Sequence, residues 1–270
     1  MKLSTKEKQR LKNKYGDWAL VSGASSGIGL ELATQLADAG FNLIINARSF
    51  GKLKLIEQEL ESKHNIQIII VDADVSEPNG IDKIIQVSKN LNIGLLVASA
   101  GYGTSGLFID SSLHDEINML RVNCEALLSL THYFSQKFAQ QKRGGIILMS
   151  SLVAFQGVPY AANYAATKAY VQSLAEAIAV ELKPYNVDVL AAAPGPVDSG
   201  FGQRSNMKIG KALKPEQIGV PILRVLGKQS NVLPGLLSKV LVYSLRAIPR
   251  WAKIKIMQQV MGGFTEHQRT

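Results

Sequence analysis

A tyrosine and a lysine four residues apart are the pair in this chain best suited to move a proton. Tyr164 and Lys168 lie in an Ala-rich segment that predicts a helix, so they share one helical face. Free tyrosine titrates near pH ~10 and gives up its proton poorly at neutral pH unless a nearby positive charge favours the phenolate. Lys168 offers that charge. The spacing predicts a proton-transfer pair, although Tyr-x-x-x-Lys is short enough to occur by chance.

The apolar run 146–149 precedes this helix and predicts a buried parallel strand. It places Ser150 and Ser151 at its carboxyl end. A serine hydroxyl brought up from there would hydrogen-bond the reacting oxygen next to the tyrosine.

A glycine-rich turn lies between a short apolar strand at 17–21 and a helical pattern at 30–39. Backbone N–H groups of such a turn, with the positive end of the helix, bind a pyrophosphate, and the missing side chains let it approach. A glycine turn without a ligand is the alternative. The turn residues expected at the cofactor are Gly23, Ser25, Ser26, Gly27, Ile28 and Gly29.

Arg48 follows the second predicted strand, 41–46, where dinucleotide folds meet the adenosine ribose. A carboxylate there holds a free 2′-hydroxyl, whereas an arginine accommodates a 2′-phosphate. No Asp or Glu stands at this point, so the sequence favours NADP(H) over NAD(H). An exposed arginine at the start of a helix is the alternative.

Strand and helix patterns alternate along the rest of the chain, with further strands near 66–71, 94–98, 187–193 and 231–233. This predicts an α/β fold with a three-layer, Rossmann-type, doubly wound parallel sheet of about seven strands. Ligands of such sheets bind at the carboxyl ends of the strands. The turn at Ala100 and Gly101 would let the backbone pass close to a cofactor there. A long helix at 113–141 contains Asn123, a residue type that commonly points to solvent inside a helix.

Composition limits the compartment and the partners. The single Cys124 excludes an internal disulfide framework and a Cys-rich metal site, and the start lacks a secretory signal, so we expect a cytoplasmic protein. Residues 1–15 and 236–270 carry six Lys/Arg each against one Glu each, whereas the rest carries 18 basic and 19 acidic residues. The basic excess in the two ends argues against nucleic-acid binding by the core. Solvated tails and contact with an anionic surface are both open.

The chain divides into a basic leader (1–15), one catalytic domain (16–235) and a basic, apolar helical extension (236–270). Residues 200–213 have no clear period and predict a mobile lid within the domain. The extension suits a membrane interface, a cover over the substrate pocket, or packing against a second subunit. All three readings favour an apolar pocket wall and a lipophilic substrate.

The motifs taken together resemble those of the short-chain dehydrogenase/reductase family over about residues 16–235. The resemblance rests on the order and spacing of Gly23, Gly27, Gly29, Asp74, Asn123, Ser151, Tyr164, Lys168, Pro194 and Gly195. One departure is Ala98-Ser99-Ala100-Gly101, where the family usually has Asn-Asn-Ala-Gly. Ser99 replaces only part of an Asn's hydrogen bonding.

The resemblance implies the catalytic roles. Tyr164 would protonate the carbonyl oxygen, and Ser151, at the family spacing, would hold that oxygen, with Ser150 one residue off it. Lys168 would bind the nicotinamide ribose and lower the pKa of Tyr164, while Asn123 would anchor a water of the proton relay. Asp74 and Val75 would contact the adenine, and Val197 and Ser199 the carboxamide end of the nicotinamide. The cofactor contacts outside the glycine turn are expected to be Arg48, Asp74, Val75, Ala100, Gly101, Tyr164, Lys168, Pro194, Gly195, Val197 and Ser199.

The sequence therefore predicts an NADP(H)-dependent oxidoreductase that transfers a hydride between nicotinamide and a carbonyl or secondary alcohol. A catalytically silent NADP(H)-binding regulator or scaffold on the same fold is the alternative. Family members often form dimers or tetramers, which implies a homo-oligomer. Substrate identity, physiological direction and stereospecificity depend on loops and lids and are not fixed by these motifs.

Overall fold

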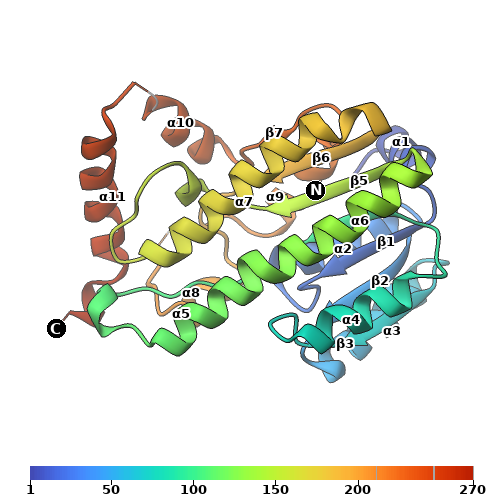
Figure 1. Cartoon of the computed structure of the whole chain (residues 1–270), viewed down its shortest axis with the longest axis horizontal. Coiled ribbons are helices and arrows are strands. Elements are labelled where there is room, and N and C mark those ends of the chain that lie inside the picture. The colour runs from blue at the N-terminus through green and yellow to red at the C-terminus, as the bar shows by residue number, and fades with distance from the viewer. Residues whose placement is uncertain (211, 246, 270) are drawn as a thin grey trace.

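A seven-stranded parallel sheet forms the centre of the protein (Figure 1). The computed structural model describes residues 1–210, 212–245 and 247–269, so the parts of the predicted lid and extension at 211, 246 and 270 lie outside the described residues. The strand order is β3-β2-β1-β4-β5-β6-β7. The strands are β1 (Trp18–Ser22), β2 (Asn42–Ala47), β3 (Ile68–Asp72), β4 (Ile93–Ala98), β5 (Gly144–Met149), β6 (Val187–Ala192) and β7 (Asn231–Val232).

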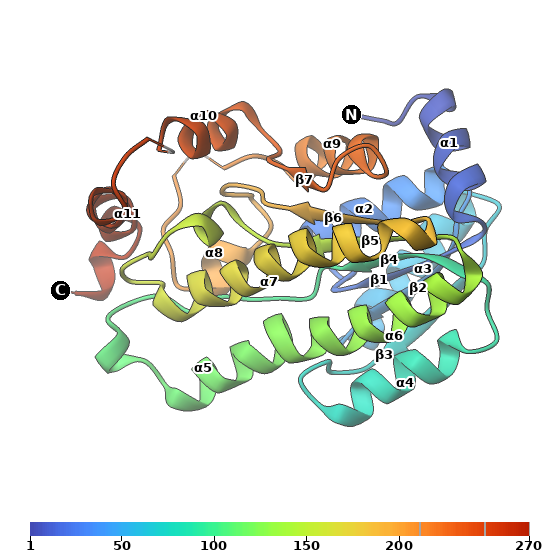
Figure 2. The same cartoon turned by 45° about the horizontal axis from the view of Figure 1, so that its top comes forward.

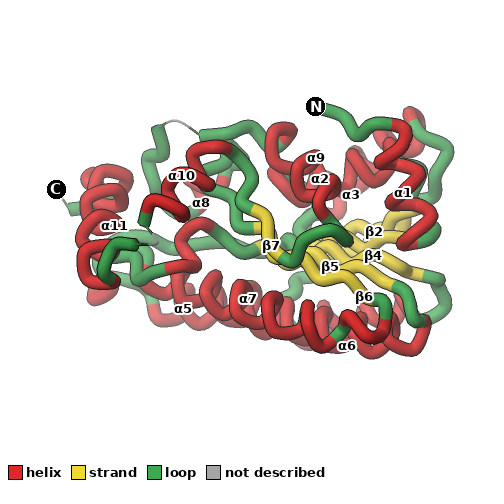
Figure 3. Tube along the Cα trace, turned by 90° about the horizontal axis from the view of Figure 1, so that it is seen from above, coloured by secondary structure: helices red, strands yellow, loops and turns green. Residues whose placement is uncertain are grey.

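Helices cover both faces of this sheet, which Figure 3 shows edge-on. One face packs against α2 (Gly27–Asp38), α3 (Phe50–Lys63) and α9 (Glu216–Val225). The other face packs against α4 (Pro78–Ser88), α6 (Leu127–Gln141) and α7 (Ala162–Glu181). Since both faces are covered, β1, β4 and β5 are buried at every position. The predicted Rossmann-type, three-layer fold is confirmed.

The basic leader is a helix and not a solvated tail. Helix α1 (Thr5–Tyr15) starts with a capping box of Ser4 and Glu7, and it buries Leu11 and Tyr15 in the same core cluster as α2 and α9. A Cβ on Gly94, at the start of β4, would lie 1.6 Å from the Tyr15 carbonyl oxygen. Helix α1 therefore seals the amino ends of the strands.

The long helix predicted at 113–141 forms, but it changes its winding in the middle. Helix α5 (Leu113–Leu120) leads into a π-helical segment, η2 (Arg121–Ala126), which continues into α6. Segments of this type insert one residue into a helical turn and occur frequently at functional sites. Asn123 lies in this segment and is fully buried, unlike most Asn residues inside helices.

The C-terminal part folds back over the carboxyl ends of the strands (Figure 2). It contains α8 (Phe201–Arg204), α10 (Leu236–Ser244) and α11 (Arg250–Phe264), with Pro249 at the start of α11. A third apolar cluster gathers here around the buried side chains of Met207, Met257 and Met261. Within the described residues, no helix has the length and apolar character needed to cross a bilayer.

Candidate active site

Tyr164 and Lys168 lie one turn apart on α7, as predicted, and face the same site. The Lys168 ammonium is 5.8 Å from the centre of the Tyr164 ring and donates a hydrogen bond to the Met149 carbonyl oxygen at 2.9 Å. Met149 is the last residue of β5, so the carboxyl end of this strand fixes where the ammonium points. Lys168 is only 6% exposed, which makes this hydrogen bond important for satisfying its charge.

Ser151, and not Ser150, stands beside the tyrosine. The hydroxyl of Ser150 is buried and donates to the Lys168 carbonyl oxygen at 3.1 Å, so it holds α7 against the end of β5. Ser151 caps the short helix η3 (Leu152–Phe155), and its side chain also hydrogen-bonds Tyr164. Ser150 thus supports α7, and Ser151 contacts the phenol.

Burial controls the protonation of this pair. It raises the pKa of Tyr164 to about 12, and the hydrogen bond with Ser151 offsets this only in part. Burial also lowers the pKa of Lys168 to about 8, because a charged ammonium is poorly solvated there. The expected lowering of the Tyr164 pKa by Lys168 is not found in this structure. The ammonium lies over the ring and is bonded to Met149, so burial of the phenol outweighs it.

Asn123 connects three segments around the site. Its side-chain amide donates to the Tyr102 carbonyl oxygen at 2.9 Å and to the Thr167 hydroxyl at 3.0 Å, and its oxygen accepts the Tyr102 N–H at 3.1 Å. A Cβ on Gly101 would lie 3.1 Å from the Asn123 oxygen and 3.4 Å from the Lys168 ammonium. A larger residue at Gly101 would therefore press on both groups.

The glycine turn has the shape of a phosphate cradle. Gly23 and Gly27 have φ angles of +70° and +59°, which favour glycine, and Cβ atoms there would lie 2.8 Å from Ala100 and 2.7 Å from Ser199. A Cβ on Gly29 would lie 2.3 Å from the Gly23 carbonyl oxygen, so this glycine allows close packing of α2 on the turn. Helix α2 begins at Gly27, three residues earlier than predicted, which directs its amino end at the cradle.

The other predicted turn residues have different surroundings. Ser26 precedes the first residue of α2 in an extended conformation, and its side chain makes no capping hydrogen bond to the helix. Ser25 is partly buried next to it. The side chain of Ile28 packs against the core cluster. Ser25 and Ser26 thus belong to the turn itself, whereas Ile28 anchors the turn to the hydrophobic core.

The ends of β2 and β3 bring Arg48 and Asp74 together. One guanidinium nitrogen of Arg48 lies 3.7 Å from a carboxylate oxygen of Asp74, and the arginine side chain is largely exposed. Asp74 also accepts hydrogen bonds from the Ser76 N–H and hydroxyl at 2.9 and 2.8 Å. Asn46, which sequence reasoning missed, is buried and donates to the carbonyl oxygens of Val71 and Ala73, so it fixes the edge on which Arg48 stands.

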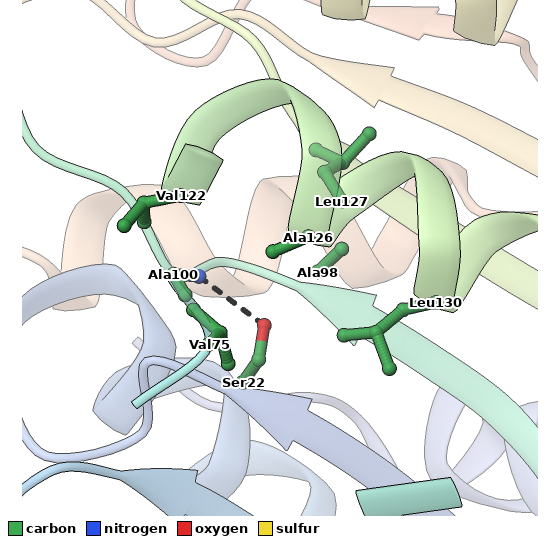
Figure 4. A pocket seen from close by; sticks show the side chains of 8 residues that line it. All are labelled: Ser22, Val75, Ala98, Ala100, Val122, Ala126, Leu127 and Leu130. Carbon is green, nitrogen blue, oxygen red and sulfur yellow. Dashed lines mark hydrogen bonds between the residues drawn. The ribbon is translucent and has the colours of Figure 1, made fainter. Parts of the chain in front are cut away.

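Val75 borders a small apolar pocket next to the turn (Figure 4). Ser22 lies at its edge and accepts hydrogen bonds from the N–H groups of Ser99 and Ala100, at 3.2 and 3.3 Å. These bonds hold the turn after β4, where the chain departs from the family's Asn-Asn pattern. The pocket is lined by Ser22, Val75, Ala98, Ala100, Val122, Ala126, Leu127 and Leu130.

The segment after β6 closes one side of the site. The Pro194 carbonyl oxygen accepts the Leu152 N–H at 2.9 Å, which joins this segment to the loop of Ser151. Ser238 of α10 sits against Gly195, where a Cβ would lie 2.6 Å from the serine hydroxyl. Val197 forms a bridge with Leu213, at the far end of the predicted lid. Ser199 then packs over Gly27, so the lid starts directly on the glycine turn.

Phe201 and two methionines complete the site, and sequence reasoning missed all three. The ring of Phe201, on α8, lies 5.2 Å from the ring of Tyr164 at an angle of 45°. Met257 and Met261 of α11 are buried in the cluster that also contains Phe201 and Tyr164. Phe201 lies in a segment without a clear period, and the apolar pattern of the extension does not mark which of its residues turn toward the site. Helix α11 thus contributes buried side chains to the apolar cluster against which Tyr164 packs.

Comparison with known proteins gives the family. Residues 17–210 match the family described as short chain dehydrogenase. The chain belongs to this family. It is 29% identical over 250 residues to a 7β-hydroxysteroid dehydrogenase of Mediterraneibacter gnavus, covering 88% of this chain and 93% of the relative. It is 33% identical over 243 residues to a very-long-chain 3-oxoacyl-CoA reductase of Coccidioides immitis, covering 87% of this chain and 66% of the relative.

Solved structures of short chain dehydrogenases agree with this assignment. A 7β-hydroxysteroid dehydrogenase structure superposes with a TM-score of 0.85 at 27% identity, covering 92% of this chain and 98% of that one. A short-chain dehydrogenase of Sphingobium yanoikuyae in complex with NADPH superposes with a TM-score of 0.79 at 23% identity, covering 90% and 95%, and shares the fold. The predicted family and enzyme class are confirmed. A solved structure with bound NADP, at 26% identity and a TM-score of 0.73, agrees with the predicted NADP(H) cofactor.

Proposed function

We propose that this short chain dehydrogenase is an NADP(H)-dependent carbonyl reductase that acts on a lipophilic ketone or an acyl-chain substrate. The observation that carries the proposal is the grouping of Ser151, Tyr164 and Lys168 at the carboxyl end of β5, beneath an apolar cover. NADP(H) supplies or accepts the hydride. The protein's own residues bind the reacting oxygen, carry its proton and exclude water.

Tyr164 is the proton donor in this proposal. With a pKa raised to about 12, its phenol keeps its proton at neutral pH, as the acid of a reduction must. Ser151, already hydrogen-bonded to the phenol, holds the carbonyl oxygen next to it. Lys168 then provides positive charge as the phenol loses its proton. Asn123 keeps the 101–102 turn and α7 in register around the pair.

The glycine cradle and Arg48 support NADP(H) as the cofactor. The three cradle glycines allow the turn to pack tightly against its neighbours, which fits a turn whose backbone N–H groups would meet a pyrophosphate at the amino end of α2. Arg48 would pair with a 2′-phosphate, since its guanidinium is exposed and its contact with Asp74 is long, at 3.7 Å. Asp74 and Val75 would lie at the adenine, and Val197 and Ser199 at the nicotinamide end.

The apolar cluster at Tyr164 supports a lipophilic substrate. Its buried side chains come from α11, from the lid and from residues 158–165 around the start of α7, and Tyr164 packs against them. The relatives are consistent with this, since one is named for a hydroxysteroid and another for a very-long-chain 3-oxoacyl-CoA. We therefore assign the 236–270 extension to the substrate pocket and not to a membrane surface. The homo-oligomer that the family resemblance implies stays a prediction.

The test is an NADPH-consumption assay with ketones graded by chain length. We expect oxidation of NADPH with kcat/KM that rises with chain length, and a loss of about 10²- to 10⁴-fold in Tyr164→Phe, which keeps the ring but removes the acid. NADPH affinity, measured by fluorescence titration, should change little in that variant. Tight NADPH binding without turnover of any carbonyl would contradict the proposal and favour a silent regulator.

A further inference from the structure

Glu116 is a buried carboxylate beside the catalytic helix that the proposed chemistry does not use. It lies on α5 with 7% of its surface exposed. One carboxylate oxygen accepts a hydrogen bond from the Thr104 hydroxyl at 2.8 Å, and the other accepts from the Asn163 side-chain amide at 2.7 Å. Asn163 also donates to the Glu116 carbonyl oxygen at 3.0 Å. Hydrogen bonds to a carboxylate are among the stronger ones in proteins.

Asn163 and Thr104, the two partners of Glu116, belong to segments that position Tyr164. Asn163 is the residue before it on α7, and Thr104 follows Gly103, whose Cβ would lie 3.0 Å from the Tyr164 ring. Glu116 and Asn123 are seven residues apart on the continuous α5–η2 run, and each joins the 102–104 loop to α7. Their contacts on α7, at Asn163 and Thr167, lie on either side of Tyr164. Glu116 therefore forms a second clamp, parallel to that of Asn123.

The start of α7 needs such support. Ala161, at the N-cap position, makes no side-chain capping bond, and Tyr160 before it has a φ of +64°, which is unfavourable for a bulky residue. A small cavity bordered by Glu116, Tyr160 and Asn163 shows that packing does not fill this corner. A carboxylate near the amino end of a helix also interacts favourably with the helix dipole. Through the Asn163 side chain, Glu116 thus ties the uncapped first turn of α7 to α5.

We propose that Glu116 is a positioning residue for Tyr164: its carboxylate joins Thr104 and Asn163 and so sets the first turn of α7 in the orientation that proton transfer requires. The side chain acts through Asn163 and not on the substrate. Loss of the clamp should lower kcat much more than it weakens NADPH binding, because the glycine turn and Arg48 bind the cofactor from other elements. Misplacement of a catalytic group by about 1 Å costs up to about 100-fold in rate.

The first experiment compares Glu116→Ala and Glu116→Gln with Asp115→Asn. We expect kcat to fall about 10- to 100-fold in Glu116→Ala and less in Glu116→Gln, whose amide oxygen still accepts one of the two hydrogen bonds. The NADPH Kd should stay within about twofold of the wild-type value. Asp115→Asn removes the neighbouring exposed carboxylate and should leave kcat unchanged. Wild-type kcat in Glu116→Ala would overturn the proposal.

A swapped pair keeps the test decisive if Glu116→Ala does not fold. Asn163→Asp alone would set two carboxylates against each other and lower kcat, whereas the double variant Asn163→Asp with Glu116→Gln restores one donor and one acceptor. We expect the double variant to recover most of the lost kcat, and no recovery would overturn the proposal. Hydrogen exchange at residues 161–166 should be faster in Asn163→Asp than in the double variant, and equal exchange rates would also contradict it.

The kcat measurements rest on the proposed function, but the two can fail separately. If the wild-type protein reduced no carbonyl, the proposed function would fail, and hydrogen exchange would still test the clamp. If the wild-type protein were active and Glu116→Ala equally so, only the clamp would fail.

Discussion

The two basic ends of the chain have similar charge and opposite tasks. Helix α1 lies at the amino ends of the strands, where Tyr15 contacts the starts of β4 and β5 through Gly94 and Gly145. Helix α11 lies at the carboxyl ends, where Met257 and Met261 pack in the cluster of Tyr164. In Figure 2 the two helices stand at opposite ends of the molecule. From charge alone, both ends were grouped as tails. Their positions on the sheet differ: α1 packs where it stabilises the domain, and α11 packs beside the catalytic residues.

The cations of helices α1 and α11 differ in the same way. In α1, Arg10 donates to the Leu226 and Leu223 carbonyl oxygens at the end of α9, and Lys14 pairs with Asp188 at 2.6 Å. In α11, Lys255 lies over the Trp251 ring at 5.7 Å, within its own helix. The charges of α1 therefore join it to the domain. Helix α11 is held instead by its apolar face.

The largest effect should come from the amino-end helix. Tyr15→Ala removes a fully buried ring and its hydrogen bond to Asp188, and we expect it to lower the free energy of unfolding by about 3–5 kcal/mol. The kcat/KM of the protein that remains folded should be unchanged. Chemical denaturation measures the first and active-site-normalised kinetics the second. Tyr185→Ala, at an exposed tyrosine, is the control, with an expected change within about 0.5 kcal/mol. Lost activity in folded Tyr15→Ala protein would break the comparison.

A smaller effect should come from the buried ammonium at the catalytic end. The pKa of Lys168 is about 8 when folded and 10.5 ordinarily, so between these values the unfolded chain binds a proton that the folded chain lacks. The free energy of unfolding should rise with pH in this window, by at most about 1.4 kcal/mol per pH unit. Lys168→Met lacks this contribution.

Denaturation curves of the wild type and Lys168→Met at pH 7 to 10 would measure the contribution of Lys168 to the free energy of unfolding. The difference between the two proteins should stay constant below pH 8 and grow in favour of the wild type above it. Tyr15, whose pKa is raised by burial and by Asp188, is common to both and cancels. A difference independent of pH would show that Lys168 is not desolvated as the structure indicates.

The smallest effect should come from one methionine of the cover. Met257→Ala shortens an apolar side chain next to the catalytic cluster, and we expect KM for a long-chain ketone to rise about five- to tenfold, with a short ketone unaffected. Val260→Ala, on the exposed side of the same helix, is the control. An equal effect on long and short ketones would mean that Met257 supports the fold and not the pocket. Steady-state kinetics with the graded ketones measures it.

Local sequence determined the sheet, the cofactor turn and the catalytic pair. Strand and helix periods repeat within a few residues, the glycine spacing is local, and Tyr164 and Lys168 share one helical face. The strands were predicted within about two residues of their observed bounds. These features depend on residues that are close in the sequence, so the sequence alone predicts them.

Contacts between distant segments decided the rest. Asn123 is buried because a π-helical segment turns it toward Tyr102 and Thr167, and no local pattern marks that change of winding. The pKa of Tyr164 is raised because other elements bury the phenol, although its neighbour on the helix is a cation. Helices α1 and α11 lie at opposite ends of the sheet because their apolar residues pack in different clusters. Burial and partner geometry arise only when the segments meet, which is why the sequence identified the reacting groups and the tertiary structure set their protonation, their support and their cover.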